Sequence, residues 1–291
     1  MESMHRFFNF IVQVGTITLY QFLSAFGFIL IFGLLLYFIS RSTRKAFSNS
    51  GHSKLDIYFT GWIGTPVHEI GHAIFCILFG HRITDLKLYS PNSQDGTLGY
   101  VNHSFNPQSI YQRIGCFFIG TGPILFGSIV IYMLIWFCLP NYRLVTGIIS
   151  TTDLSDFGIF ELVESSGSIL AIGLGFLVNV FSPENFLEPS FWIFIYLSFC
   201  ISSHMQLSPS DLKSMWSGIL TILFIILLVN SLMILLEFNL TPYVLKFSRL
   251  TEGATKIFIL ATFISFTNFL VTYLILAAFH FKKHKRLLSI R

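Results

Sequence analysis

The chain has 291 residues, of which 53% are hydrophobic and only 11% are charged, and its formal net charge is +4. Soluble domains carry about 25% charged residues, so this composition indicates an integral, multi-pass membrane protein. We expect the protein to lie in a bacterial-type cell membrane and to contact the lipid bilayer directly. The basic residues lie between apolar runs and at the C-terminus rather than in one stripe, which argues against nucleic-acid binding.

Apolar runs long enough for membrane spans recur along the chain. A transmembrane helix needs about 20 predominantly apolar residues. Six runs are plausible spans, at 17–39, 57–80, 114–138, 190–206, 216–238 and 255–281, although the fourth is short. The expected fold class is therefore an all-α polytopic membrane protein with about six transmembrane helices. A shorter apolar run at 169–181 is interpreted as a re-entrant or interfacial helix.

The segment 82–104, between the second and third spans, has a different pattern. Thr84 and Leu86 fall on one face of an extended chain, and Asp85 and Lys87 fall on the other. The turn residues SPNSQDG follow, and TLGYV resumes a strand-like composition, so the segment predicts a small β-hairpin. Because an open sheet edge cannot face lipid, the hairpin must lie at the surface or be enclosed by helices.

These features divide the chain into three parts. Residues 1–56 contain the first span and a basic loop, 57–215 form a membrane core with the hairpin and a polar loop at 139–168, and 216–291 contain two spans and a basic tail. The polar loop carries acidic residues spread among apolar ones, and we interpret it as a solvated amphipathic loop. These acidic residues are Asp153, Asp156, Glu161 and Glu164.

The motif HEIGH lies inside the second apolar run. On a helix, His68 and His72 share a face one turn apart, so both imidazoles can reach one metal ion, and Glu69 beside them can serve as a general base. A charged residue at the centre of a membrane helix costs about 2.5–3.5 kcal/mol, which favours a functional role for Glu69. The motif predicts a Zn²⁺ site. Pro66 either follows the helix start near Thr65 or bends a longer helix.

A catalytic zinc site usually has three protein ligands, so a third must come from elsewhere in the chain. Asp211, in the segment SSHMQLSPSDLKS, follows one apolar run and precedes another, and helix packing can bring its carboxylate to the metal. Asp211 is also well placed to be a helix cap. His204 is the alternative third ligand, or a polar group near the substrate. His81 lies nine residues after His72 and is a poor candidate.

The order of these features resembles the site-2 protease family of intramembrane zinc metalloproteases. The resemblance covers about residues 57–215: HEIGH in a membrane helix, a hairpin ending in LGYV, the Gly-Pro of GTGPILFG, and a later aspartate. It implies a three-helix core bearing the site and hydrolysis of peptide bonds within or next to transmembrane segments of substrate proteins. It further implies that His68, His72 and Asp211 bind zinc, that Glu69 is the catalytic base, and that the hairpin guides the substrate.

Two positions depart from the family pattern. Phe126 stands where the motif GPxxN has asparagine, and Leu212 follows the aspartate where the family usually has glycine. Two other functions remain open on the sequence: a membrane-embedded zincin that acts on soluble or juxtamembrane peptides, and a non-catalytic zinc-binding membrane regulator. If the chain is a protease of either the site-2 or the zincin type, its substrate is a membrane protein or a peptide.

Overall fold

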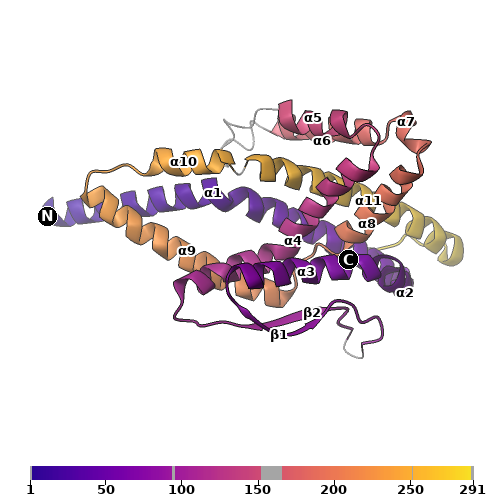
Figure 1. The fold of residues 1–291 in the computed structure, drawn as a ribbon, viewed down its shortest axis with the longest axis horizontal. Helices are drawn as coiled ribbons and strands as arrows, with labels where there is room; N and C mark the ends of the chain where they lie inside the picture. The colour runs from indigo at the N-terminus through magenta and orange to yellow at the C-terminus, as the bar shows by residue number, and fades with distance from the viewer. Residues whose placement is uncertain (1, 94–95, 152–165, 251, 290–291) are drawn as a thin grey trace.

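The computed structural model is almost entirely helical and describes residues 2–93, 96–151, 166–250 and 252–289 (Figure 1). Its elements are α1 (Glu2–Asn49), α2 (Ser53–Leu55), the π-helix η1 (Asp56–Gly61), α3 (Trp62–Leu78), β1 (Arg82–Lys87), β2 (Tyr100–Ser104), α4 (Ile110–Cys138), α5 (Tyr142–Thr151), α6 (Ser166–Val180), α7 (Pro183–Phe186), α8 (Pro189–Ser203), α9 (Pro209–Leu235), α10 (Thr241–Leu250) and α11 (Glu252–His284). Within the described residues the two strands form the only sheet. The all-α class with a small hairpin is therefore confirmed.

Four helices are long and apolar enough to cross a membrane. They are α1, α4, α9 and α11, and they contain four of the six predicted spans. The other two predicted spans, 57–80 and 190–206, correspond to α3 with 17 residues and α8 with 15 residues. At 1.5 Å per residue these helices are about 22–26 Å long, shorter than the ~30 Å hydrocarbon layer. By this length criterion four helices qualify as spans and the predicted number of six is not confirmed; η1 extends the helical run that contains α3 toward its N-terminus.

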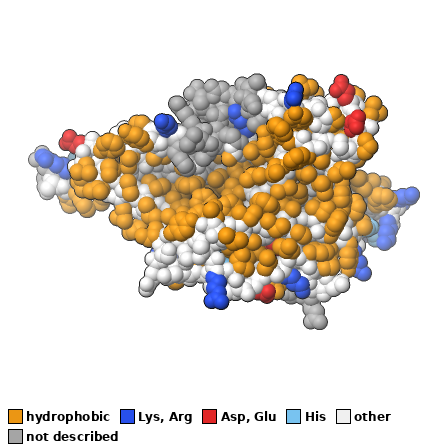
Figure 2. Space-filling view, in the orientation of Figure 1, with side chains coloured by type: hydrophobic (Ala, Val, Ile, Leu, Met, Phe, Trp, Pro, Cys, Tyr) orange, Lys and Arg blue, Asp and Glu red, His pale blue; other side chains and the backbone are white. Residues whose placement is uncertain are grey.

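The exterior is strongly apolar, as a lipid-facing surface requires. Figure 2 shows hydrophobic side chains covering much of one face, with Lys and Arg at its margins. Large aromatic side chains such as Phe137, Trp136 and Phe224 are more than half exposed. The buried core lies between α1, α4, α8, α9 and α11 and includes Phe117 and Ile124.

The predicted β-hairpin is present at 82–104. Strands β1 and β2 are antiparallel, with Arg82 opposite Ser104 and Lys87 opposite Tyr100, and the register shifts between Ile83 and Asp85. The second strand, expected at 97–101, begins at Tyr100, so residues 97–99 precede it without strand assignment. The hairpin lies along α3 (Figure 1), so helices cover one side of it.

One further segment differs from its expected structure, and another agrees with it. Within the predicted polar loop, residues 142–151 form helix α5, because apolar side chains such as Val145 pack into the core. The four acidic residues of that loop lie outside the described residues. The helix predicted at 169–181 is present: the run lies within α6 except for its last residue, Phe181, which is in the turn that follows.

Helix α3 does not begin at Thr65. It continues directly from η1 and contains Pro66 in its interior, so the longer of the two expected helices forms. Pro66 has no N–H to donate to the carbonyl of Trp62. The change from π-helix to α-helix lies between Gly61 and Trp62, six residues before His68, and π-helical segments are frequent at functional sites.

Candidate metal centre

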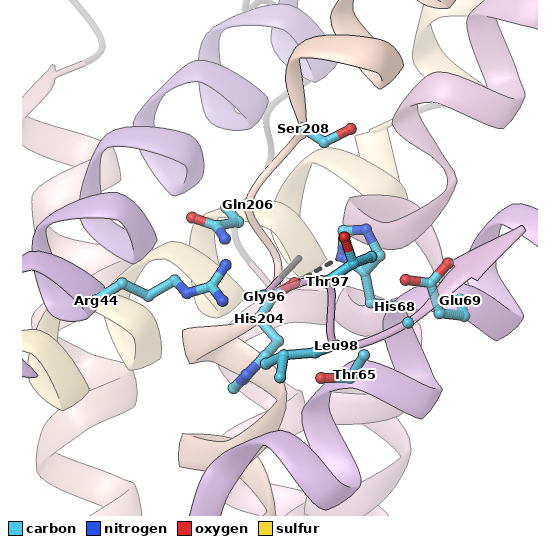
Figure 3. A pocket seen from close by; sticks show the side chains of 11 residues that line it. Arg44, Thr65, His68, Glu69, Gly96, Thr97, Leu98, His204, Gln206 and Ser208 are labelled. Atoms are coloured by element: carbon cyan, nitrogen blue, oxygen red, sulfur yellow. Dashed lines mark hydrogen bonds between the residues drawn. The ribbon is translucent and has the colours of Figure 1, made fainter. Parts of the chain in front are cut away.

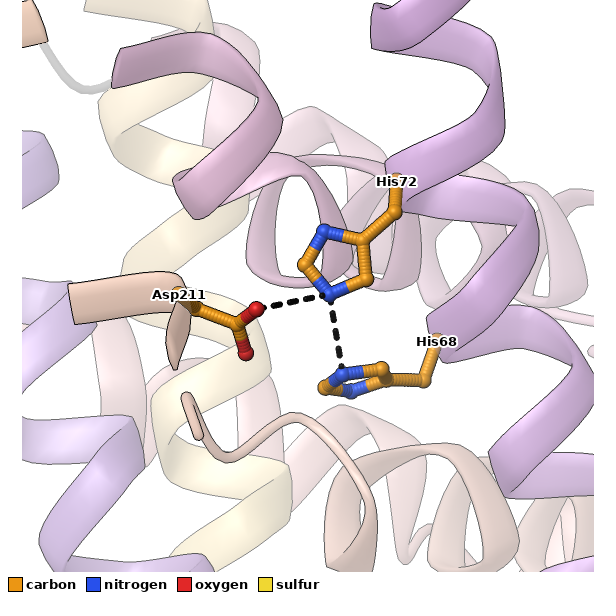
Figure 4. A group of neighbouring side chains, drawn as sticks. All are labelled: His68, His72 and Asp211. Atoms are coloured by element: carbon orange, nitrogen blue, oxygen red, sulfur yellow. Dashed lines mark hydrogen bonds and ion pairs between the residues drawn. The ribbon is translucent and has the colours of Figure 1, made fainter. Parts of the chain in front are cut away.

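Three potential metal ligands converge at the middle of the helical core. His68 and His72 project from α3 toward Asp211, which lies in the first turn of α9 (Figure 4). One ligand atom from each residue lies within 4.8 Å of the others. In the part of the chain that the structure describes, no other His, Cys, Asp or Glu residues form such a group.

Backbone carbonyls fix the orientation of both imidazoles. The Nδ1 atom of His68 lies 2.7 Å from the carbonyl oxygen of His204, and Nδ1 of His72 lies 2.7 Å from that of Ile119. A carbonyl can only accept, so each Nδ1 carries a proton and donates it. The neutral form of each ring then has a bare Nε2, and these two atoms face each other. Carbonyl-held imidazoles of this kind are the usual outer arrangement of metal-binding histidines.

Two of the three separations between these atoms match those around a tetrahedral zinc ion. The Nε2 atoms of His68 and His72 are 3.2 Å apart, and Nε2 of His72 is 3.3 Å from Oδ1 of Asp211. Ligand atoms about 2.0–2.2 Å from a common tetrahedral centre lie about 3.3 Å apart. Acceptor atoms that face one another at this distance repel unless a cation lies between them. The donor set and its spacing therefore fit Zn²⁺.

Asp211 acts as both a helix cap and a member of the cluster. Its Oδ2 accepts a hydrogen bond from the backbone N–H of Ser208 at 2.7 Å, while the Ser208 hydroxyl accepts from the backbone N–H of Asp211. This is a capping box at the start of α9. The other carboxylate oxygen, Oδ1, points to His72. The two roles considered for Asp211 are thus compatible, because each uses a different oxygen.

Glycines allow the helices that carry the cluster to approach closely. A Cβ at Gly71 would lie 2.8 Å from the carbonyl oxygen of Gly122, where α3 meets α4. A Cβ at Gly120 would lie 2.8 Å from the carbonyl oxygen of Asp211, where α4 meets α9. Any larger residue would therefore push α3 or α9 away from α4, and the ligand atoms apart.

Glu69 lies beside the cluster and is buried, with only 6% of its surface exposed. Together with His68 it lines a cavity of about 190 Å³. The segment 96–99 covers this side of α3, since a Cβ at Gly99 would lie 2.8 Å from Cγ of Glu69. Glu69 is therefore next to both the candidate metal site and a cavity large enough for water or a side chain.

The other histidines considered from the sequence lie outside the three-residue cluster. The ring of His204 lines the cavity, with Nδ1 near the carbonyl of Cys200, and its backbone carbonyl holds His68. His81 is hydrogen-bonded to His103 and to the carbonyl of Gln112. Burial lowers the pKa of His81, and burial followed by the neighbouring His81 lowers the pKa of His103.

Sequence patterns did not reveal three further residues of this region. Arg44 and Gln206 line the cavity, and Asp56 is buried beside Arg44. In the sequence, Arg44 belongs to the basic end of an apolar run, which indicates only a membrane boundary. Asp56, a charged residue immediately before an apolar run, was the available signal, but nothing in the sequence pairs it with Arg44.

Comparisons of the chain with protein-family models, curated proteins and solved structures found no match. Function must therefore be inferred from the side chains and their arrangement.

Proposed function

We propose that this chain is an intramembrane zinc metalloprotease of the site-2 protease type, which hydrolyses peptide bonds within or next to transmembrane segments. The main support is the convergence of His68, His72 and Asp211, with two bare imidazole nitrogens and a carboxylate oxygen facing one another. In this proposal α3 and α8 join the four long helices in the membrane, giving about six membrane helices.

The three side chains hold Zn²⁺ in the proposed enzyme. Bound zinc polarises a carbonyl group and lowers the pKa of a water molecule, which are the two requirements of peptide hydrolysis that a protein side chain supplies poorly. His204 and Ile119 keep the imidazoles in the correct tautomer through their carbonyls. The capping box keeps the Asp211 carboxylate in place.

Glu69 is the proposed general base. Its place one residue after His68, on the cavity wall, allows it to take a proton from the attacking water and deliver it to the leaving amine. A carboxylate that was only structural would be expected to have a partner. In the described residues Glu69 has neither an ion pair nor a hydrogen bond, although it is buried.

The hairpin provides a surface for the substrate backbone. A peptide bond inside a helix is shielded by its own hydrogen bonds, so the substrate must unwind before it is cleaved. Residues 96–99, which lead into β2, line the same cavity as His68 and Glu69. Pairing with this segment would satisfy backbone groups that unwinding exposes.

Reconstituted cleavage tests this proposal. Full-length protein is incubated in liposomes with a set of single-span model peptides, and fragments are identified by mass spectrometry. We expect cleavage by the wild type, loss of cleavage with a zinc chelator, and at least a 100-fold lower rate for Glu69→Gln, because general base catalysis contributes about 10²–10⁴-fold. A Glu69→Gln variant that cleaves at the wild-type rate would contradict the proposal.

A non-catalytic zinc-binding regulator makes the opposite prediction. If the wild type binds zinc yet cleaves no membrane or soluble peptide, and Glu69→Gln sustains the function of the chain in cells, the regulator is the better description. Cleavage of soluble peptides alone would favour the membrane-embedded zincin with a different substrate class.

A further inference from the structure

The cavity beside the candidate metal centre has a second, cationic end. Figure 3 shows Arg44 reaching from α1 toward Gln206 and His204, across the cavity from Glu69. The cavity volume of about 190 Å³ is below the roughly 300–1,000 Å³ of pockets for drug-sized molecules. It therefore fits a side chain or a chain end rather than a folded segment.

A buried acid holds the Arg44 guanidinium in place. Nε of Arg44 lies 3.6 Å from Oδ2 of Asp56, and the other oxygen of Asp56 accepts a hydrogen bond from the Thr60 hydroxyl at 2.9 Å. This pair uses only the Nε side of the guanidinium. Among the described residues, the terminal nitrogens of Arg44 meet no acceptor within hydrogen-bond distance. A guanidinium oriented in this way is prepared to bind a second carboxylate.

Two residues of the cavity wall also have buried polar atoms that lack partners. Thr65 Oγ1 and His204 Nε2 have no hydrogen bond in the structure, although both residues are only 5% exposed. Both atoms are buried within the protein rather than exposed to the cavity, so binding of a carboxylate depends on the Arg44 guanidinium.

We infer that the Arg44 end of the cavity is a carboxylate-binding subsite, so that a substrate presents an acidic group beside the bond to be cleaved. The group is an Asp or Glu side chain or the C-terminal carboxylate of the peptide, since both offer the same two oxygens. This inference rests on the proposed function, because it treats the cavity as the substrate site. Arg44 lets the enzyme distinguish substrates by charge. Contacts with an apolar membrane segment alone do not allow this distinction.

Peptide binding tests the subsite separately from hydrolysis. Full-length Glu69→Gln protein in nanodiscs of zwitterionic lipid is titrated with three fluorescent peptides of one apolar sequence: with a free C-terminus, with an amidated C-terminus, and amidated with one Glu. We expect one or both carboxylate peptides to bind about 10–100-fold more tightly than the neutral one, as a charged hydrogen bond allows. Which of the two binds tightly identifies the source of the carboxylate. Equal affinity for all three peptides would overturn the inference.

The variants assign the preference to Arg44. Arg44→Gln, made in the Glu69→Gln background, should remove the preference, and Arg44→Lys should retain only part of it because Lys lacks the planar fork. Arg41→Gln is the matched control: Arg41 lies one turn earlier on α1, is exposed, and bonds Tyr37. If Arg44→Gln is unstable because Asp56 loses its partner, the double variant with Asp56→Asn replaces the ion pair with two amides. A preference that survives in it would overturn the inference.

The headgroup of an anionic lipid is the other ligand that can bind an arginine such as Arg44 in a membrane protein. Adding anionic lipid to the nanodiscs separates the two. Anionic lipid that displaces the carboxylate peptides from protein with Arg44, but not from the Arg44→Gln variant, would assign the site to lipid. This result would overturn the inference. Unchanged peptide affinity supports the peptide subsite. Wild-type cleavage assays test the proposed function independently, because binding is measured in a variant that lacks the base.

Discussion

At the residue scale, the site depends on which atom of each side chain faces which neighbour. His68 and His72 each direct Nδ1 to a carbonyl and Nε2 to the other ligands, and Asp211 divides its oxygens between a helix cap and His72. A change that removes the cap and a change that removes the ligand therefore have different consequences.

The pair Asp211→Asn and Ser208→Ala separates these two roles. Asn retains an oxygen that accepts from the Ser208 N–H but carries no charge, so Asp211→Asn should lower zinc affinity by more than about 100-fold, beyond the 10–100-fold typical of losing an outer partner. Ser208→Ala removes the hydroxyl cap and should cost about 1 kcal/mol of unfolding free energy with zinc affinity nearly unchanged. Competition with a zinc indicator and chemical denaturation measure the two effects. Equal zinc affinity of Asp211→Asn and the wild type would show that the aspartate is only a cap.

The sequence predicted the side chains of the cluster better than their surroundings. HEIGH predicts two ligands and a base because a helical repeat fixes their shared face, and Asp211 was a candidate because it lies between two apolar runs; the structure brings His68, His72 and Asp211 together. The carbonyls of His204 and Ile119 could not be predicted, since any residue supplies a carbonyl and only packing selects one. Arg44 and Asp56 are twelve residues apart with a helix end between them, so no periodicity connects them.

At the element scale, α3, α4 and α9 hold the cluster through close backbone contacts. The helix α3 is short, and the packing at Gly71 and Gly122 determines how near its histidines lie to Asp211. Small residues at such crossings are the usual means of close helix approach in membranes. The Cβ distances show this role for Gly120 and Gly122 of α4.

Gly71→Ala should disturb both the fold and the metal site. The added methyl group would lie 2.8 Å from the Gly122 carbonyl oxygen, so the helices must separate. Overpacking of this kind costs about 1–3 kcal/mol, and zinc affinity should fall with it. Gly15→Ala is the control, because a Cβ at Gly15 meets no atom within 4 Å. Denaturation and zinc titration of both variants provide the comparison, and a Gly71→Ala protein that matches Gly15→Ala would contradict this account of the α3–α4 contact.

The membrane spans illustrate how hydropathy and structure differ. Apolar runs predict helices well, and all six runs are helical along most of their length. Their lengths depend on breaks that hydropathy does not report, such as the η1 segment before α3 and the residues between α8 and α9. These interruptions are also where Asp56 and His204 lie, so they belong to the site rather than to simple spans.

At the scale of the whole molecule, α1 and α11 end side by side, far from the N-terminus (Figure 1). Asn49 donates a hydrogen bond to the carbonyl of Ser289, and Ala46 packs against Leu276 and Leu288. Basic residues gather at this end of the two helices: Arg41, Arg44, Lys45, Lys54, Lys282, Lys283, Lys285 and Arg286. Since cytoplasmic segments of membrane proteins are rich in Lys and Arg, we expect this end in the cytoplasm.

Reporter fusions test this orientation. Green fluorescent protein fused after Arg286 should fluoresce, and alkaline phosphatase at the same place should be inactive, because it folds only outside the cytoplasm. Fusions after Glu2, at the other end of α1, are the control and should give the opposite result for each reporter. Active phosphatase after Arg286 would contradict the orientation. Because Arg44 belongs to the basic end and lines the cavity, fluorescence of the green fluorescent protein fused after Arg286 would place the cavity on the cytoplasmic side.

The zinc content of purified full-length protein tests the central claim most directly. Inductively coupled plasma mass spectrometry should find about one zinc ion per wild-type chain and per His81→Ala chain, and almost none in folded His68→Ala or His72→Ala protein. A wild-type chain that stays free of zinc after incubation with the metal, or histidine variants that retain as much zinc as the wild type, would contradict the account.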